Sequence, residues 1–269
     1  MTVRTESSAT VLGQLPAWVT LVRAPNPGPM TLDGTNTWVL RAPSGEAIVV
    51  DPGPLHEGHL AAVAAAGDVR TVITTHHHID HTEGVARLLE LCPRAWLWRP
   101  TAEDGDPGES SRWSQGGLEL RCIATPGHTA DSVTLVGGVD DERVVLTGDT
   151  ILGRGTTVIA DPDGDLGEYL ASLRLLELLG PLPVLPGHGP ALSDCGVAAA
   201  YYLRHRLARL EQVRAARAAG ATTAREMVEI VYADVDPELW PAAEASVRAQ
   251  LAYLDATESR PAAAELDSA

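Results

Sequence analysis

The sequence predicts an α/β fold, and three observations support this expectation. Short runs rich in valine, isoleucine and leucine alternate with helical segments from residue 18 to residue 186, which is the pattern of sheets covered by helices. Several of these runs end in loops that carry histidine or aspartate. From about residue 197 onward only helical patterns follow, which indicates a helical C-terminal part.

The first half of the chain contains five predicted strands, each a β-branched or apolar run bounded by turn residues. They are residues 18–23, 36–41, 46–50, 69–75 and 96–99. The second and third flank Ala42-Pro43-Ser44-Gly45, which is typical of a hairpin turn. Helices are expected at 56–66 and 82–91, with His56 and His59 solvated on the first of them.

The second half contains four predicted strands, of which the middle two form a hairpin. They are residues 118–124, 132–136, 143–146 and 182–186. The polar segment 101–117 is expected to be a surface loop. Aspartate or threonine three residues before glutamate, at Asp165 and Thr223, is the spacing of a capped helix start. The predicted helices are residues 169–179, 197–219, 223–231 and 237–254.

A histidine-rich loop, residues 76–81, follows the run that ends at Thr75. The neutral imidazole ring is the commonest metal ligand in proteins. His76 and His78 alternate, so an extended backbone places both rings on one side. Asp80 and His81 follow where a helix begins, and they can serve a neighbouring position. The loop therefore predicts the start of two metal sites; a tract that binds metal only fortuitously is the alternative.

Three further ligand-type residues lie just beyond predicted strands, in loops that contain glycine. They are His128, Asp149 and His188. Together with the loop they make a seven-donor set, which suits two zinc ions that share a bridging carboxylate and keep room for water. Asp51 also follows a strand, and there a supporting role is favoured over direct metal binding.

Composition narrows the possible partners. The formal net charge is −16, which disfavours binding to phosphate backbones. Five arginines form a local basic segment on the predicted long helix, and we interpret them as a solvated face whose stems cover apolar surface, with phosphate contact as the alternative. They are Arg204, Arg206, Arg209, Arg214 and Arg217.

Neither the cysteines nor the apolar runs indicate a secreted or membrane protein. Cys92, Cys122 and Cys195 are scattered among apolar residues, which predicts packing roles instead of a disulfide framework. The sequence has no apolar run long enough to cross a bilayer and no apolar signal-peptide core. A cytoplasmic location without membrane contact is therefore expected.

The succession HxHxDH, PGHT, GDT and PGHG resembles the signature of the metallo-β-lactamase superfamily. These motifs stand at residues 76–81, 126–129, 148–150 and 186–189. Residues 26–37 and 148–157, with His205-Arg206 on the long helix, further resemble the lactamase-beta-2-like branch. The resemblance implies a four-layer αββα sandwich with metals at one edge and a small winged-helix-like C-terminal domain.

Carried over residue by residue, the resemblance implies two metal sites. His76, His78 and His128 would hold the first zinc, and Asp80, His81 and His188 the second, with Asp149 between them. His77 and Ile79 would be structural, and Asp51 would orient a ligand by hydrogen bonding. The implied division is a flexible N-terminus (1–16), a metallo-β-lactamase domain (17–215), a helical winged-helix-like domain (216–256) and a disordered tail (257–269).

The implied activity is hydrolysis by a metal-bridging hydroxide, with Asp80 orienting the nucleophile as a catalytic residue and with iron or manganese as alternatives to two zinc ions. The expected substrate is a thioester or ester, either a small molecule resembling those of glyoxalase II or a carrier-bound acyl chain. Asp149 argues against an antibiotic, because true β-lactamases of the superfamily generally lack it. A single-stranded RNA endoribonuclease and a non-catalytic metal-binding scaffold are the alternatives; the sequence singles out no substrate-binding residue and no oligomeric state.

Overall fold

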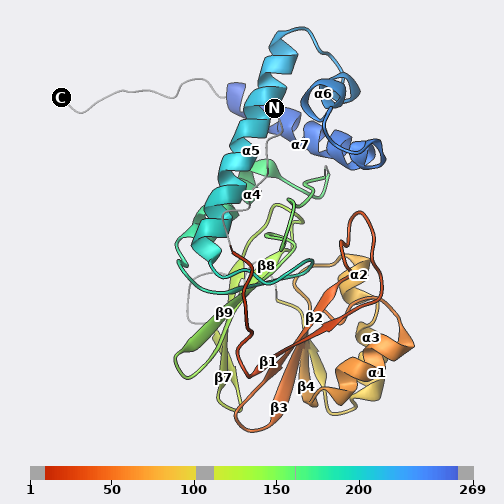
Figure 1. The fold of residues 1–269 in the computed structure, drawn as a ribbon, viewed down its shortest axis with the longest axis vertical. Helices are drawn as coiled ribbons and strands as arrows, with labels where there is room; N and C mark the ends of the chain where they lie inside the picture. Colours follow the sequence, from red (N-terminus) through yellow and green to blue (C-terminus); the bar gives the residue numbers. More distant parts are fainter. Residues whose placement is uncertain (1–9, 101–111, 161, 260–269) are drawn as a thin grey trace, which may run out of the picture.

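Two five-stranded sheets lie in the lower half of the molecule as drawn in Figure 1. A computed structural model describes residues 10–100, 112–160 and 162–259. The first sheet has the order β1-β2-β3-β4-β5. Its strands are β1 (Val19–Arg23), β2 (Asn36–Arg41), β3 (Glu46–Val50), β4 (Asp68–Ile73) and β5 (Trp96–Trp98). Strands β1 to β3 pair antiparallel, whereas β3, β4 and β5 run parallel.

The second sheet has the order β10-β9-β8-β7-β6. Its strands are β6 (Arg112–Gln115), β7 (Leu118–Ala124), β8 (Val133–Val139), β9 (Glu142–Gly148) and β10 (Val184–Pro186). All pairs are antiparallel except β9 with β10, which is parallel. Both sheets are therefore mixed.

Alternation along the strands divides the core into layers. In β2, Leu40 packs between the two sheets, while its neighbour Val39 packs on the outer face beneath helices. The cluster between the sheets contains Trp38, Ile48 and Ile73 from the first sheet and Leu120, Leu135 and Leu146 from the second. The residues that face inward from each strand thus hold the two sheets together.

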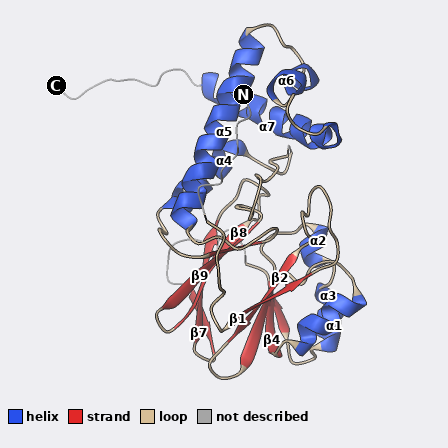
Figure 2. Ribbon diagram, viewed as in Figure 1, coloured by secondary structure: helices blue, strands red, loops and turns tan. Residues whose placement is uncertain are grey.

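Helices cover the outer face of each sheet, which completes an αββα sandwich (Figure 2). Over the first sheet lie α1 (Glu57–Ala65) and α3 (Val85–Leu91), and the short α2 (Ile79–Thr82) precedes α3. Over the second lie α4 (Leu166–Glu177) and the first part of the long helix α5 (Cys195–Ala218). The predicted four-layer fold is confirmed.

The C-terminal part is a helical unit built on the far end of α5 (Figure 1). It contains α6 (Ala224–Val231), the 3₁₀ turn η2 (Pro237–Leu239) and α7 (Trp240–Glu258). The predicted capping box is present, because Thr223 and Glu226 each accept from the other's backbone N–H. Within the described residues no strand follows β10.

Three local predictions differ from the structure. Residues 112–115 of the expected surface loop form strand β6, because they pair antiparallel with β7; residues 101–111 of that loop lie outside the described residues. The expected helix 82–91 begins only at Val85, as α3, because Thr82 ends the separate short helix α2 and residues 83–84 lie between the two helices. Helix α7 continues through Thr257 to Glu258, two residues into the expected disordered tail, whose remainder from 260 lies outside the described residues.

The expected boundaries of the domains fall within continuous structure. The predicted border at 215/216 lies inside α5, which runs unbroken to Ala218. At the other end, Val11 forms a β-bridge with Leu192; residues 1–9 lie outside the described part. Cys122 and Cys195 are buried, as expected of packing residues. No helix in residues 10–100, 112–160 or 162–259 is both long enough and apolar enough to cross a bilayer.

Candidate metal centre

The seven predicted donors converge at one edge of the sandwich. The histidine-rich loop follows β4, His128 follows β7, Asp149 follows β9 and His188 follows β10. Within these seven, two groups that share no residue are each close enough to hold a metal ion: His76 with His78 and His128, and Asp80 with His81 and His188. A third such grouping, His76 with His81 and Asp149, connects the two.

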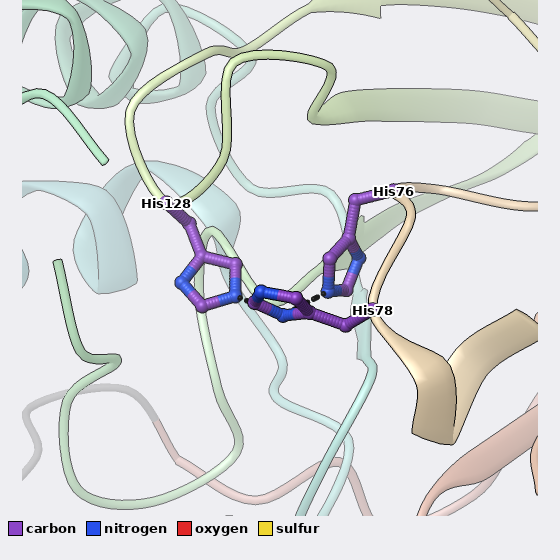
Figure 3. Close-up of side chains that lie close together, drawn as sticks. All are labelled: His76, His78 and His128. Atoms are coloured by element: carbon purple, nitrogen blue, oxygen red, sulfur yellow. Dashed lines mark hydrogen bonds between the residues drawn. The ribbon is translucent and has the colours of Figure 1, made fainter. Parts of the chain in front are cut away.

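The first group is a triad of imidazole nitrogens (Figure 3). His78 Nδ1 lies 3.0 Å from His76 Nε2 and 3.1 Å from His128 Nε2. Nitrogens held tetrahedrally by zinc at about 2.0–2.1 Å from the ion lie about 3.3 Å from one another. The spacing of the triad therefore fits one metal ion at its centre.

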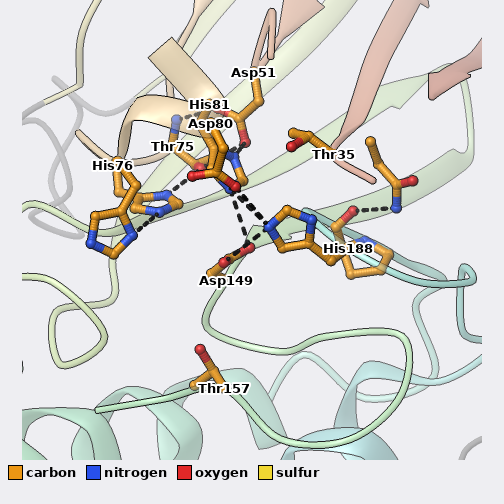
Figure 4. A network of polar contacts seen from close by, with 12 residues as sticks. Thr35, Asp51, Thr75, His76, Asp80, His81, Asp149, Thr157 and His188 are labelled. Atoms are coloured by element: carbon orange, nitrogen blue, oxygen red, sulfur yellow. Dashed lines mark hydrogen bonds and ion pairs between the residues drawn. The ribbon is translucent and has the colours of Figure 1, made fainter. Parts of the chain in front are cut away.

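The second group combines two imidazoles with a carboxylate (Figure 4). His188 Nε2 lies 3.2 Å from both His81 Nε2 and Asp80 Oδ2. His81 Nε2 and Asp80 Oδ2 are 3.5 Å apart. Nitrogen and carboxylate oxygen at these separations also fit one divalent ion.

Asp149 lies between the two groups. Its Oδ2 is 3.3 Å from His188 Nε2 in the second group and 3.9 Å from His128 Nε2 in the first. Its Oδ1 is buried and lies 3.5 Å from His81 Nε2, but it has no hydrogen-bond partner. Burying a carboxylate oxygen without a hydrogen-bond donor costs folding free energy, and a bound cation would remove that cost. The missing hydrogen bond at this oxygen is evidence, independent of the sequence motif, that the centre fits a metal.

Glycine makes the close approach of Asp149 possible. A Cβ at Gly187 would lie 2.3 Å from Asp149 Oδ1 and 2.8 Å from His81 Cε1. No other residue leaves that space. Gly187 therefore has to be glycine for the two donors to meet.

The two groups differ in their electrostatics. Burial and the neighbouring His81 hold the pKa of His76 well below its usual value, and burial and His128 lower the pKa of His78. Burial also opposes charge on His81, yet Asp149 and Asp51 outweigh it and raise the pKa of His81. In the same way Asp149 and Asp80 overcome burial and raise the pKa of His188 to about 9.

The pKa of Asp149 is held well below its usual range, because His81 and His188 outweigh the effect of its burial. Without a metal, the lowered pKa values keep His76 and His78 of the first group neutral, whereas protons and carboxylates stabilise the second group. A metal entering the second group has to displace those protons.

Asp51 fixes the orientation of His81. Its Oδ2 accepts from His81 Nδ1 at 2.9 Å and from the Thr75 hydroxyl at 2.8 Å, while Oδ1 accepts from the Thr75 backbone N–H at 2.7 Å. Asp51 has a positive φ of 54° and is 1% exposed. Both carboxylate oxygens of Asp51 thus accept hydrogen bonds from His81 or Thr75, which is the arrangement that a supporting role requires.

We expect Asp51→Asn to weaken metal binding by about 10- to 100-fold, because the amide loses one acceptor and the negative charge that hold His81 Nε2 toward the centre. Zinc titration of the metal-free protein measures the change. Activity should return at excess zinc. Unchanged affinity would show that Asp51 does not orient a ligand.

The structure corrects the prediction for His59. This residue is 4% exposed and not solvated. Its Nε2 lies 3.0 Å from both the Thr37 hydroxyl and the Pro52 carbonyl, so it anchors the loop that follows Asp51. His56 is exposed, as expected, and caps α1 by accepting from the His59 backbone N–H.

His77 and Ile79, the two residues of the loop without a predicted metal role, are both exposed. His77 is exposed and pairs with Asp131 at 2.8 Å and with Asp163 at 3.4 Å. Asp131 raises the pKa of His77. Ile79 is 69% exposed.

Contacts supplied by the backbone were not predicted from the sequence. His128 Nδ1 lies 2.7 Å from the Val158 carbonyl and 3.1 Å from the Thr157 hydroxyl. His188 Nδ1 lies 3.3 Å from the Gly34 carbonyl. Such contacts fix which ring nitrogen faces a metal. Every residue has a backbone carbonyl, so the sequence does not show which one contacts a ligand. The two threonines at 156–157, which follow the GDT motif, were the one sequence feature near these contacts.

Most of the basic segment on α5 is already engaged within the chain. Arg217 pairs with Asp255 and Glu258, and Arg214 with Glu211 and Glu258. Arg209 donates to the Val231 carbonyl, and only Arg204 is exposed without a described partner. The interpretation of a solvated face is wrong for Arg206, which is 6% exposed.

Comparisons with known proteins agree with this architecture. A family model described as the metallo-beta-lactamase superfamily matches residues 30–104 and 93–188, and a model described as the beta-lactamase associated winged helix domain matches residues 223–258. The beta-lactamase-like protein 2 homolog of Drosophila melanogaster is 32% identical over 256 residues, which span 86% of this chain and 85% of that protein.

Two further matches bear on substrate and fold. The atrochrysone carboxyl ACP thioesterase of Aspergillus fumigatus is 31% identical over 230 residues, which span 77% of this chain and 71% of that protein. The crystal structure of a beta-lactamase domain protein from Burkholderia ambifaria superposes with a TM-score of 0.78, covering 95% of this chain and 94% of that one at 23% identity. At that identity the likeness is one of fold.

Proposed function

We propose that this chain, which belongs to the metallo-beta-lactamase superfamily and is a hydrolase, cleaves acyl thioesters at a dinuclear metal centre. The observation that carries the proposal is the position of Asp149, whose carboxylate lies between two complete donor triads. Zinc is the proposed metal, because imidazole and carboxylate ligands at these spacings suit it. Iron and manganese accept similar ligands.

The residues of the centre would hold two metal ions. The first metal would be held by His76, His78 and His128, and the second by Asp80, His81 and His188, with Asp149 shared. Bound there, two divalent metals supply a water acidic enough to ionise near neutral pH and polarise the carbonyl of the substrate. The protein contributes donor side chains in fixed positions and carboxylates whose charges are in place before the substrate binds.

Asp80 is the carboxylate on the open side of the centre. Its side chain is 25% exposed, against 9% for Asp149. Burial opposes its ionisation, but His188 and His81 outweigh burial and lower the pKa of Asp80. Asp80 is therefore an ionised acceptor that can orient an attacking water, in addition to holding a metal.

The leaving group favours a thioester. Thiols have pKa values of about 8.5 and depart as thiolates, whereas an alkoxide needs a proton donor. Asp80 is held ionised and cannot readily donate one. The thioesterase relative acts, by its name, on an acyl group bound to a carrier protein, which supports the same substrate class for this chain. The net charge of −16 and the engaged arginines of α5 disfavour RNA.

A substrate panel tests the proposal. The zinc-loaded protein should hydrolyse acyl N-acetylcysteamine thioesters of increasing chain length or S-lactoylglutathione, and should leave single-stranded RNA intact. His128→Ala should lower thioester hydrolysis by at least about 100-fold, because the first metal loses one of its three imidazoles. His56→Ala removes an exposed histidine outside the centre and is the matched control. Cleavage of RNA that His128→Ala abolishes, with no thioester turnover, would reverse the substrate assignment.

A further inference from the structure

Arg206 is a buried cation in α5 for which the described residues offer no carboxylate at ion-pair distance. Its Nε is buried without a hydrogen-bond partner. A buried charge of this kind is costly to keep. A contact that needs the charge or the planar guanidinium of Arg206 is therefore expected.

Two contacts define where the guanidinium lies. Its NH2 group donates to the backbone carbonyl of Thr157. Its carbon lies 5.5 Å from the centre of the Tyr169 ring, in α4, at cation–π distance. Arg206 therefore joins the helical layer to the segment that follows β9.

That segment, residues 149–158, serves both metal groups. It begins with Asp149, and it ends with the Thr157 hydroxyl and the Val158 carbonyl, both of which contact His128 Nδ1 (Figure 4 shows Thr157 and Asp149). Residues 150–158 form bends and loop, so no strand pairing or helix holds their backbone in place.

The helical layer holds the segment at three points. Tyr169 donates to the Thr150 carbonyl at 2.7 Å. The Tyr202 hydroxyl bonds both the N–H and the carbonyl of Leu152, at 2.9 Å and 3.1 Å. Arg206, one turn beyond Tyr202 on α5, holds Thr157. The two tyrosines hold the end near Asp149, and of these three side chains Arg206 is the one that holds the end near His128.

We infer that Arg206 is a positioning residue that acts through Thr157 and Val158 to aim His128 Nε2 at the first metal position. The inference rests on the metal centre proposed above. By this route α5, which also carries the C-terminal helical unit, sets the geometry of a metal ligand it does not touch.

Arg209 offers a matched control on the same helix. Its guanidinium lies 4.7 Å from the centre of the Tyr232 ring and donates to the Val231 carbonyl at 2.5 Å. The chemistry is that of Arg206, an arginine over a tyrosine ring that donates to a backbone carbonyl. Arg209 differs in holding helix α6 of the C-terminal unit and in lying 3.9 Å from a carboxylate oxygen of Asp234.

The experiment compares Arg206→Met with Arg209→Met in the full chain loaded with Zn²⁺ or Co²⁺. We expect Arg206→Met to weaken retention of one metal by about 10- to 100-fold, to change the visible spectrum of the Co²⁺ protein, and to lower kcat more than it raises KM. Arg209→Met should lower thermal stability without altering the metal content or the spectrum. A role confined to packing would move the unfolding temperature in both variants and the spectrum in neither.

The outcomes separate this inference from the function it rests on. If the parent protein binds no metal, the proposed centre fails; if the parent loads two metals and folded Arg206→Met binds them with unchanged affinity and spectrum, the positioning role is overturned. If Arg206→Met does not fold, Thr157→Val decides, because it removes only the hydroxyl next to His128. Weaker metal retention in that variant supports the route through Thr157, and unchanged retention overturns it.

Discussion

Asp149→Asn is expected to lower kcat/KM by about 10³- to 10⁴-fold, which corresponds to about 4–5.5 kcal/mol of transition-state stabilisation. The amide keeps the shape of the side chain but loses the charge that both metal groups share. Asp149 is 8% exposed and lies within ion-pair distance of His81, His128 and His188, so water cannot replace that charge. Steady-state kinetics on the substrate found in the panel measure the loss.

Metal content adds a second readout for this substitution. The imidazole triad of His76, His78 and His128 stays intact, so Asp149→Asn should retain about one metal per chain where the parent retains two. Asp131→Asn is the control, because Asp131 is an exposed carboxylate beside the centre that pairs with His77. Parental activity and metal content in Asp149→Asn would contradict a shared carboxylate.

Local patterns account for what the sequence predicted well. The hairpin of β2 and β3 was predicted with the bounds it has, because β-branched runs and the intervening turn act over a few residues. The grouping of His128, Asp149 and His188 with the histidine-rich loop was also predictable, since each follows a strand and the strand ends meet at one edge of the sandwich. The motif order tied these positions to a family with a known arrangement.

What the sequence did not predict depends on partners distant along the chain. Residues 112–115 look polar and loop-like, and they become a strand only because β7 provides an edge to pair with. His59 is buried by Thr37 and Pro52, which β2 and the loop after β3 bring to it. Arg206 looks like its neighbours on a helix face, yet the face it occupies packs against the loop after β9. Helical periodicity indicates which residues share a face, but not what that face covers.

Removal of the metals is expected to abolish hydrolysis and to leave the protein folded but less stable. Free metal at about 1,000 times its dissociation constant stabilises the native state by about 4 kcal/mol. For a chain of this size that amount shifts the unfolding temperature by about 8–16 °C. The fold should survive because protonated His81 and His188 pair with Asp51, Asp80 and Asp149 in the metal-free centre. Zinc should restore both activity and stability.

The stability lost on chelation should also grow with pH. In the metal-free protein the pKa of His188 is raised to about 9, above the ordinary value of 6.5. A raised histidine pKa stabilises the folded state fully below about pH 6.5, and this contribution is lost as the pH rises through about 9. Over the same interval metal binding strengthens, because fewer protons have to be displaced. The difference in unfolding temperature between zinc-loaded and chelated protein should therefore be larger at pH 8.5 than at pH 6.5, measured by calorimetry in buffers of equal ionic strength. A difference that is constant or shrinks with pH would show that His188 does not carry a proton in the metal-free centre.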